Sequence, residues 1–442
     1  MRIVVIGAGA VGSHLADRLS HEGQDVIVIE SDAARAEEVQ AEIDCLVIHG
    51  NGASHETLVE AGVDRSDLLI AVSSSDAVNV LAAHAAGRLG SARRIARVED
   101  PQLRDEALAL GVDLLIDPAE TTARELVLLL KQRGVSELIE FADGRLDLIG
   151  GFISADAPVA GLTLSELRDR VSGWSWIVVA IVRDGETMIA RGSTRVLAGD
   201  HVLFMAETDK SAEAFTLLGL HEQPAKKVAI LGATRLAERT AIRLCQEGIQ
   251  TLLVDQEASK VQEISEKIPR LVGVVGDPTD PKLLRSEGID TADAVLALTG
   301  WDEVNIIGCL VAKAVGVPTV VARLHRQDLV RLLAGVGIDT GVSTRLTAAG
   351  EILRYVRRGK VHSVVTFQDS DAEAIEVEVS ETSPSAGKTL RSLHLPHELI
   401  VGGVIRGDEV FVARGDTTIE VGDRLIVIAL PKAIHEVELL SG

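Results

Sequence analysis

The sequence predicts an α/β protein made of two copies of one unit, each with a doubly wound parallel sheet followed by a smaller α+β module. Three observations support this. Short apolar runs alternate with segments of helical spacing in the first part of each copy. Hydrophobic residues make up 46% of the chain but aromatic residues only 2%, and aliphatic cores favour parallel sheets covered by helices. The third observation is an internal repeat.

The repeat has an offset near 226 residues in its first part. Residues 71–79 read AVSSSDAVN where residues 297–305 read ALTGWDEVN, and residues 157–167 (APVAGLTLSEL) align with residues 383–393 (SPSAGKTLRSL). Two copies of a two-part unit give four expected domains. We place their limits at 1–134, 135–221, 222–360 and 361–442.

The larger module of the first copy contains six runs typical of strands. They are Arg2–Ile6, Val26–Ile29, Cys45–Ile48, Leu68–Val72, Arg94–Val98 and Asp113–Ile116. Helical spacing covers Val11–Ser20, Asp32–Glu42 and Ala119–Arg133. Six strands alternating with helices predict a Rossmann-like doubly wound parallel sheet.

The smaller module, about residues 136–219, shows short alternating strands separated by turn signals such as Ala142-Asp143-Gly144. This pattern predicts a small mixed or antiparallel sheet. Thr163 followed by Glu166 predicts a helix that opens with a capping box.

Composition excludes several classes of function. A net charge of −22 argues against nucleic-acid binding, which needs a basic face. Cys45, Cys245 and Cys309 are far apart, which predicts core residues rather than a disulfide framework or a metal site, and fits a reducing compartment. The longest apolar stretch, residues 306–322, is interrupted by a lysine, a glycine and a proline, so it predicts a helix end, a turn and a strand rather than a membrane span. We expect a cytoplasmic protein.

A glycine-rich turn between the first strand and the first helix is the main functional signal. The pattern Gly7-x-Gly9-x-x-Gly12 allows a tight turn and close approach of the backbone to a pyrophosphate, and the helix N-terminus attracts phosphate. Glu30 ends the second strand, where a carboxylate binds both ribose hydroxyls and repels a 2′-phosphate. The sequence therefore predicts a site for NAD(H), or for ATP or ADP, formed by Gly7, Ala8, Gly9, Ala10, Val11, Gly12 and Glu30.

Polar residues after the later strands complete this predicted site. Asn51 and Gly52 follow the third strand and Ser73 the fourth, at the edge where ligands of such sheets bind; ordinary loop structure is the alternative. Arg97 ends the fifth strand and is a candidate phosphate ligand, or a partner in a salt bridge. Asp76 is expected to cap a helix.

The second copy departs from the pattern. Gly232 is kept, but Thr234 replaces the second glycine, where its side chain obstructs a pyrophosphate. Arg235 follows as a possible direct phosphate contact. The remaining candidates keep positions like those of the first copy: Asp255 for the ribose, with Asp277 and Thr299 after later strands. We expect an altered nucleotide site here, either for a mononucleotide or empty.

No catalytic or metal-binding residues are predicted. A dehydrogenase needs an acid or base beside the nicotinamide and a domain that holds the substrate, and neither stands out. Ligand sensing is therefore the favoured interpretation, and an NAD-dependent oxidoreductase is the alternative.

These motifs resemble the TrkA family, the peripheral regulatory subunits of Trk-type potassium uptake systems built from RCK/KTN domains. The resemblance rests on the IVVIGAGAVG turn with Glu30, the SSSDAVN and TGWDEVN segments, the Ala-Arg pairs ending at Arg97 and Arg323, and the two AGxTLxxL segments. It covers essentially the whole chain.

The resemblance implies a regulator on the inner face of the cell membrane that binds NAD(H) or ATP/ADP. It also implies a tetramer beneath an integral-membrane, potassium-translocating subunit of the TrkH/TrkG kind, and smaller modules that carry small ligands or mediate assembly. The membrane partner remains open, since an RCK-type regulator of a different cation transporter or antiporter fits the same motifs. The acidic charge gives a reason to dock on cytoplasmic loops, which are rich in Lys and Arg.

Overall fold

The computed structural model describes residues 1–130, 135–170, 175–220, 224–326, 336–356, 361–367 and 372–441, together with Leu329 and Leu333. It divides into two compact units, residues 1–122 with 344–356 and residues 123–343 with 357–442. The expected domain limits at residues 134, 221 and 360, and residues 131–133 of an expected helix, lie outside the described residues. The limits therefore stay predictions.

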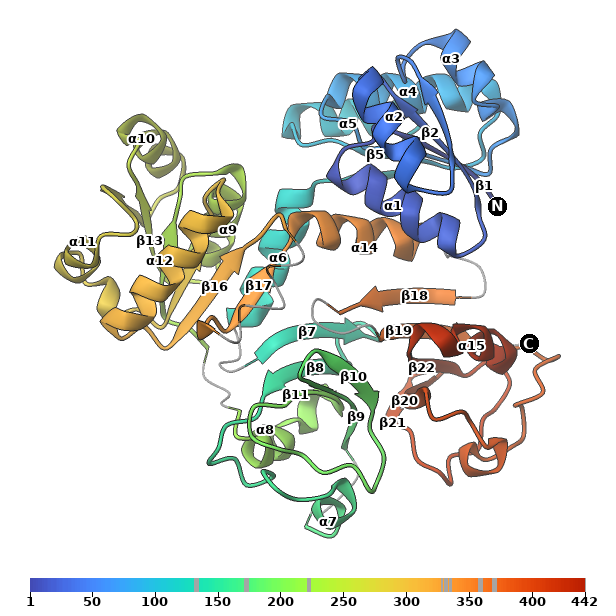
Figure 1. Ribbon diagram of the computed structural model, residues 1–442, viewed down its shortest axis with the longest axis vertical. Helices are drawn as coiled ribbons and strands as arrows, with labels where there is room; N and C mark the ends of the chain where they lie inside the picture. Colours follow the sequence, from blue (N-terminus) through green and yellow to red (C-terminus); the bar gives the residue numbers. More distant parts are fainter. Residues whose placement is uncertain are drawn as a thin grey trace. The chain divides into compact units, whose positions relative to one another are not determined.

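The first unit contains a six-stranded parallel sheet in the order β3-β2-β1-β4-β5-β6. Its strands are β1 (Arg2–Ile6), β2 (Asp25–Glu30), β3 (Leu46–His49), β4 (Leu68–Ala71), β5 (Arg94–Arg97) and β6 (Leu114–Ile116). Its helices are α1 (Ala10–His21), α2 (Ala33–Glu42), α3 (His55–Glu60), α4 (Asp76–Leu89), α5 (Arg104–Ala109) and the start of α6 (Pro118–Leu130). The predicted doubly wound sheet is confirmed, and Figure 1 shows it in blue.

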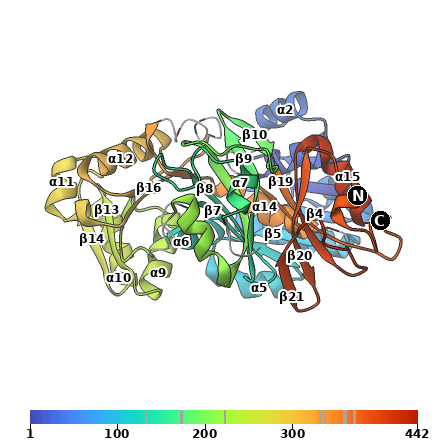
Figure 2. The same cartoon turned by 90° about the horizontal axis from the view of Figure 1, so that it is seen from below.

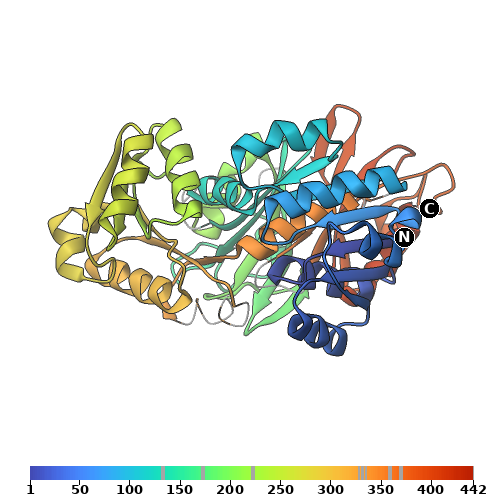
Figure 3. The same ribbon diagram turned by 90° about the horizontal axis from the view of Figure 1, so that it is seen from above.

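A helix from far along the chain completes the core of this unit. Helix α14 (Thr344–Val356) packs on α1, and Figure 3 shows it in orange beside the blue helices. Its buried residues Ala349, Ile352 and Leu353 belong to the same apolar cluster as Val5 and Leu15. One face of the first sheet is therefore covered by residues that follow the second sheet in sequence.

The second unit repeats the parallel sheet in the order β14-β13-β12-β15-β16-β17. Its strands are β12 (Lys227–Leu231), β13 (Gln250–Asp255), β14 (Leu271–Val275), β15 (Ala294–Ala297), β16 (Thr319–Arg323) and β17 (Thr340–Val342). Figure 2 shows helices on both sides of this sheet: α9 (Arg235–Gln246) and α10 (Ala258–Lys267) on one, α11 (Pro281–Ser286) and α12 (Asp302–Val315) on the other. The stretch at 306–322 is the end of α12, a turn at Gly316 and β16, as expected.

The smaller modules, also in the second unit, are five-stranded antiparallel sheets. The first contains β7 (Val135–Phe141), β8 (Leu146–Phe152), β9 (Trp176–Arg183), β10 (Glu186–Ile189) and β11 (His201–Glu207), with α7 (Leu164–Arg168) and α8 (Ala212–Leu218). The second contains β18 (Val361–Thr366), β19 (Glu373–Glu378), β20 (Leu399–Arg406), β21 (Glu409–Val412) and β22 (Arg424–Ala429), with α15 (Ile434–Ser441). The Thr163–Glu166 capping box is present.

The two antiparallel sheets share one apolar core. Leu148 and Met205 of the first module cluster with Phe367, Ile405 and Ile426 of the second. This shared burial joins two modules that lie far apart in the sequence.

The expectation that all three cysteines are core residues is only partly met. Of the three cysteines only Cys309 is fully buried, while Cys45 and Cys245 are half-buried, because they lie at element ends rather than in the sheet interior. No helix in the described part of the chain is long and apolar enough to cross a membrane.

Candidate nucleotide sites

The glycine turn of the first unit is tight on one side and open on the other. Gly7 has φ +93°, and a Cβ there would lie 2.8 Å from Cα of Ser73. A Cβ on Gly12 would lie 1.9 Å from the carbonyl oxygen of Gly7. Nothing lies within 4 Å of a Cβ built on Gly9. Gly7 and Gly12 are therefore needed to close the turn, whereas Gly9 leaves the approach to the helix N-terminus open.

The N-terminus of α1 has the geometry of an anion site. Gly9 is its N-cap and supplies no side-chain hydrogen bond, so the first N–H groups of the helix have no side-chain cap. Ala10 is exposed at the first helical position, and the Val11 side chain is buried in the core. Both therefore offer backbone groups rather than side chains to a ligand.

Glu30 lies directly against this turn. Its Oε2 accepts a hydrogen bond from the Ala8 N–H at 2.6 Å, and its Oε1 accepts from the Asp32 N–H at 2.9 Å. Burial acts to raise the pKa of the Glu30 carboxyl, but these bonds and one from Ser31 outweigh it and lower the pKa. The carboxylate is thus ionised and held at the end of β2, the position expected for a ribose ligand.

The loop after β4 is fixed by a buried residue that the sequence analysis did not assign to the site. Asn79, fully buried on α4, accepts hydrogen bonds at Oδ1 from the Ser73 N–H (2.9 Å) and hydroxyl (2.7 Å). Its Nδ2 donates to the Arg97 carbonyl at 2.9 Å. One side chain therefore links Ser73 and Arg97 at the sheet edge. Asn79 and Asn305 occupy the same position in the two copies of the repeat, and this identity was the sequence signal that pointed to them.

The remaining first-copy candidates lie at the same edge with local partners. The Arg97 guanidinium forms an ion pair with Glu99, so the salt-bridge alternative is what the structure contains. Asp76 is not the helix cap: the Ser75 hydroxyl caps α4, because Asp76 instead accepts the N–H groups of Glu99 and Asp100.

Two further candidates, Asn51 and Gly52, both follow β3. Asn51 is exposed and accepts the Ala53 N–H in a local turn. Gly52 is buried, and a Cβ there would lie 2.2 Å from Cγ2 of Ile6. Gly52 thus allows the loop to approach the end of β1, while the Asn51 side chain faces solvent.

The second unit repeats this frame with a different helix start. The Ala233 N–H donates to Asp255 Oδ2 at 2.6 Å, as Ala8 does to Glu30. Gly232 has φ +104° and packs on Thr299. Thr234 caps α9: its Oγ1 accepts from the Ala237 N–H at 3.3 Å and donates to the Leu298 carbonyl at 2.7 Å. The first unit has Gly9 at this N-cap position and no side-chain cap.

Thr299 and Asn305 reproduce the Ser73–Asn79 network, with Oδ1 of Asn305 accepting from the Thr299 N–H at 2.8 Å and Nδ2 donating to the Arg323 carbonyl at 2.9 Å. Asp277 accepts from the hydroxyl and N–H of Thr279, which lowers the pKa of its carboxyl. Asp277 therefore stabilises its own loop.

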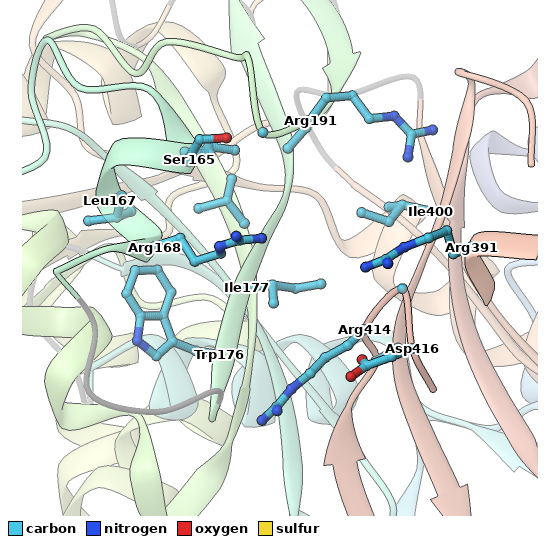
Figure 4. Close-up of a pocket in the computed structure, with 16 residues that line it drawn as sticks. Ser165, Leu167, Arg168, Trp176, Ile177, Arg191, Arg391, Ile400, Arg414 and Asp416 are labelled. Carbon is cyan, nitrogen blue, oxygen red and sulfur yellow. The ribbon is translucent and has the colours of Figure 1, made fainter. Parts of the chain in front are cut away.

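A separate cavity of about 630 Å³ lies between the two smaller modules. Arginines line it from both sides: Arg168 on α7, Arg191 after β10, Arg391 on the short helix Leu390–Leu393, and Arg414 after β21. Figure 4 shows Arg168 and Arg391 extending toward each other from opposite sides. Single arginines at such different places in the sequence gave no signal of a shared cavity.

Arg191 reaches across this cavity to the second antiparallel module. Its Nη2 donates to the carbonyls of Pro396 (2.9 Å) and Leu399 (2.8 Å), and burial lowers the pKa of its guanidinium. Asp416 is an acidic group in the lining. The cavity has the chemistry of an anion site.

Two parallel sheets with glycine turns, each with a ribose-type carboxylate, define the class of tandem dinucleotide-fold proteins. Within the described residues no group of three or more His, Cys, Asp or Glu side chains is placed to hold a metal ion.

Family models for the TrkA-N domain match residues 3–118 and 228–344, and those for the TrkA-C domain match residues 152–219 and 374–442. The chain belongs to the TrkA family.

Curated relatives extend over the whole chain. A "Trk system potassium uptake protein TrkA homolog" of Archaeoglobus fulgidus is 33% identical over 443 residues, covering 99% of both chains. TrkA of Vibrio alginolyticus is 30% identical and covers 100% of this chain and 98% of its own. The GsuK channel bound to NAD superposes with a TM-score of 0.63 at 18% identity, covering 99% of this chain and 78% of that one; this likeness shows the shared fold.

Proposed function

We propose that the chain is a cytoplasmic regulatory subunit that senses NAD(H) or ATP/ADP and gates a membrane potassium-uptake channel or transporter of the Trk type. The observation that carries the proposal is the open glycine turn at α1 with Glu30 bonded to it. Membership of the TrkA family supports the transport role, because the curated relatives are named as Trk potassium uptake proteins. The proposed role is binding rather than catalysis.

The proposed mechanism is a population shift. A nucleotide that binds two assembly states with different affinity changes their populations, and coupling energies of about 1–3 kcal/mol are typical of such links.

We propose a homotetramer that docks on an integral-membrane, TrkH/TrkG-like subunit. The net charge of −22 favours Lys- and Arg-rich cytoplasmic loops, so raising the salt concentration should weaken docking.

The direct test is Glu30→Ala with Glu37→Ala as the matched control, since Glu37 is exposed on the following helix. Removing charge-assisted bonds to the ribose should weaken nucleotide binding about 10- to 100-fold in calorimetry, and abolish nucleotide-dependent potassium flux in proteoliposomes that contain the membrane subunit. The control should keep both. Flux that still responds to nucleotide when Glu30→Ala has lost binding would exclude the first site as the switch.

The alternatives make different predictions. An NAD-dependent oxidoreductase should oxidise bound NADH when given a panel of small carbonyl substrates, whereas a sensor binds NADH without turnover. A regulator of a different cation transporter or antiporter would bind the same nucleotides. Purification from membranes with the partner identified distinguishes it from the Trk-type proposal.

The arginine cavity supports a second ligand role for the smaller modules. We propose that it binds an anionic small molecule between them. Inorganic pyrophosphate can serve as probe, because Trp176 lines the cavity and reports binding by fluorescence. Arg391→Gln should abolish the response, and Arg170→Gln, exposed outside the lining, should not. An equal response from both variants would rule the cavity out.

A further inference from the structure

The two nucleotide sites differ most at one arginine that they share. Arg97 ends β5 and Arg323 ends β16, and the carbonyl of each accepts a hydrogen bond from the buried asparagine of its unit. Both guanidinium groups therefore start from equivalent points at the carboxyl edge of a parallel sheet, beside the Ser73 or Thr299 loop. In doubly wound sheets this edge receives the part of the ligand beyond the pyrophosphate.

In the first unit the charge of this arginine is neutralised. Arg97 Nε donates to Glu99 Oε1 at 2.8 Å, and its Nη2 donates to the same oxygen. The paired ions present no net charge to a ligand. Such an environment suits the uncharged ribose of a dinucleotide's second half better than a terminal phosphate.

In the second unit a histidine replaces the neutralising glutamate. Arg323 Nη2 donates to Nε2 of His325 at 3.0 Å, and His325 Nδ1 bonds Asp302 Oδ1 at 2.8 Å. Because a guanidinium has only donors, Nε2 of His325 accepts the bond from Arg323. Arg323 thus has no carboxylate bonded directly to it among the described residues.

The orientation of Arg323 also differs. Its Nη1 lies 3.5 Å from the Thr299 carbonyl, and its buried Nε has no hydrogen-bond partner within the described structure. Burial lowers the pKa of this guanidinium, with Asp302 acting in the opposite direction. A phosphate oxygen would supply the missing acceptor.

The helix start adds to this difference. Arg235 occupies the first position of α9, where the first unit has Ala10. The second unit therefore has His325 where the first has Glu99, and Arg235 where the first has Ala10. Thr234 meanwhile stands where the first unit has Gly9, and its Oγ1 accepts the Ala237 N–H, a group at the helix N-terminus that a pyrophosphate would otherwise bind.

We propose that the two units select different nucleotides: the first takes a dinucleotide such as NAD(H), and the second takes a nucleoside di- or triphosphate whose terminal phosphate binds Arg323. This inference rests on the proposed nucleotide-sensing function and assigns a ligand class to each site. The His325 position determines the specificity, since a carboxylate there would neutralise Arg323 as Glu99 neutralises Arg97.

The test uses the full chain titrated with NAD, ADP and ATP. Trp301, 71% exposed in the second unit's loop, reports that site by fluorescence, and Trp301→Phe identifies its signal. His325→Glu should weaken ADP and ATP binding there about tenfold by neutralising Arg323, with NAD binding unchanged. Arg323→Gln should do the same without adding a carboxylate, and Glu99→His is the matched exchange in the first unit.

The outcomes separate this inference from the proposed function. If ADP and ATP binding disappears in Glu30→Ala and is unaffected by His325→Glu and Arg323→Gln, the second site does not select them and the inference fails, while the sensing function stands. If both sites bind as expected but nucleotides leave potassium flux unchanged, the sensing function fails and the site assignment stands. Absence of binding by all three nucleotides overturns both.

Discussion

The two parallel-sheet modules share a frame and differ at the start of the helix that follows the glycine turn. The buried Asn79 and Asn305 make the same bonds to the loop after the fourth strand and to the arginine of the fifth. The helix starts differ, because Gly9 provides no side-chain cap whereas the Thr234 hydroxyl caps α9. The duplicated scaffold has therefore been kept while the residues at its proposed ligand sites differ, which is how function usually varies on one fold.

The modules also differ in how their cores are completed. The first sheet is covered in part by α14, which follows the second sheet in sequence. The core of the first module is therefore completed by a helix that follows β17 in sequence.

The largest expected effect comes from shortening a core side chain of α14. Ile352→Ala removes a fully buried group and should lower the unfolding free energy of the first module by about 3–5 kcal/mol through the cavity it leaves. Hydrogen exchange of residues 1–122 measures this. Leu126→Ala on α6, buried outside that cluster, is the size-matched control and should leave the exchange of residues 1–117 unchanged. Equal effects would show that α14 is not specific to the first module.

The second effect tests the glycine turn. Gly12→Ala places a Cβ 1.9 Å from the Gly7 carbonyl oxygen, so the helix must shift, and NAD affinity of the first site should fall about 100-fold. Calorimetry measures the loss. The second unit already has alanine at this position, and Ala237→Gly should leave ADP and ATP binding unchanged. Tight NAD binding by Gly12→Ala would mean that the turn does not hold the pyrophosphate.

Sequence patterns predicted the frame better than the site chemistry. Strand and helix periodicity, the repeat and the capping box at Thr163 are local signals, and the sheets and that helix start were found as expected. Glu30 was placed correctly against the turn because strand ends converge at one edge. The Arg323–His325–Asp302 chain and the four-arginine cavity join residues whose proximity depends on tertiary packing. Their spacing in sequence carries no periodic signal.

The third effect should be equal in both modules if the frame is truly shared. Asn79→Ala and Asn305→Ala each leave a partly buried loop N–H and an arginine carbonyl without their asparagine partner. The cost should be about 2 kcal/mol in each module, read from hydrogen exchange of the loops at residues 72–76 and 298–302. A clearly larger loss in one module would show that the equivalent networks carry unequal weight.

The smallest effect is a pH dependence present in one module. Burial, with Arg345 on α14 and Arg18 next in importance, lowers the pKa of His14 to about 4. The unfolded chain, with a pKa near 6.5, binds the proton more readily, so the stabilisation is complete above pH 6.5 and is lost as the pH falls toward 4.

Between pH 7 and pH 5 the first module should lose about 1–2 kcal/mol through His14, allowing for its partial exposure. The second module has Thr240 at this position, fully buried and bonded to the Leu236 carbonyl. His14→Thr should therefore remove this part of the acid sensitivity in denaturant titrations at the two pH values. If the acid sensitivity of the first module is unchanged in His14→Thr, another group titrates there and the α1–α14 contact is not the source of the difference.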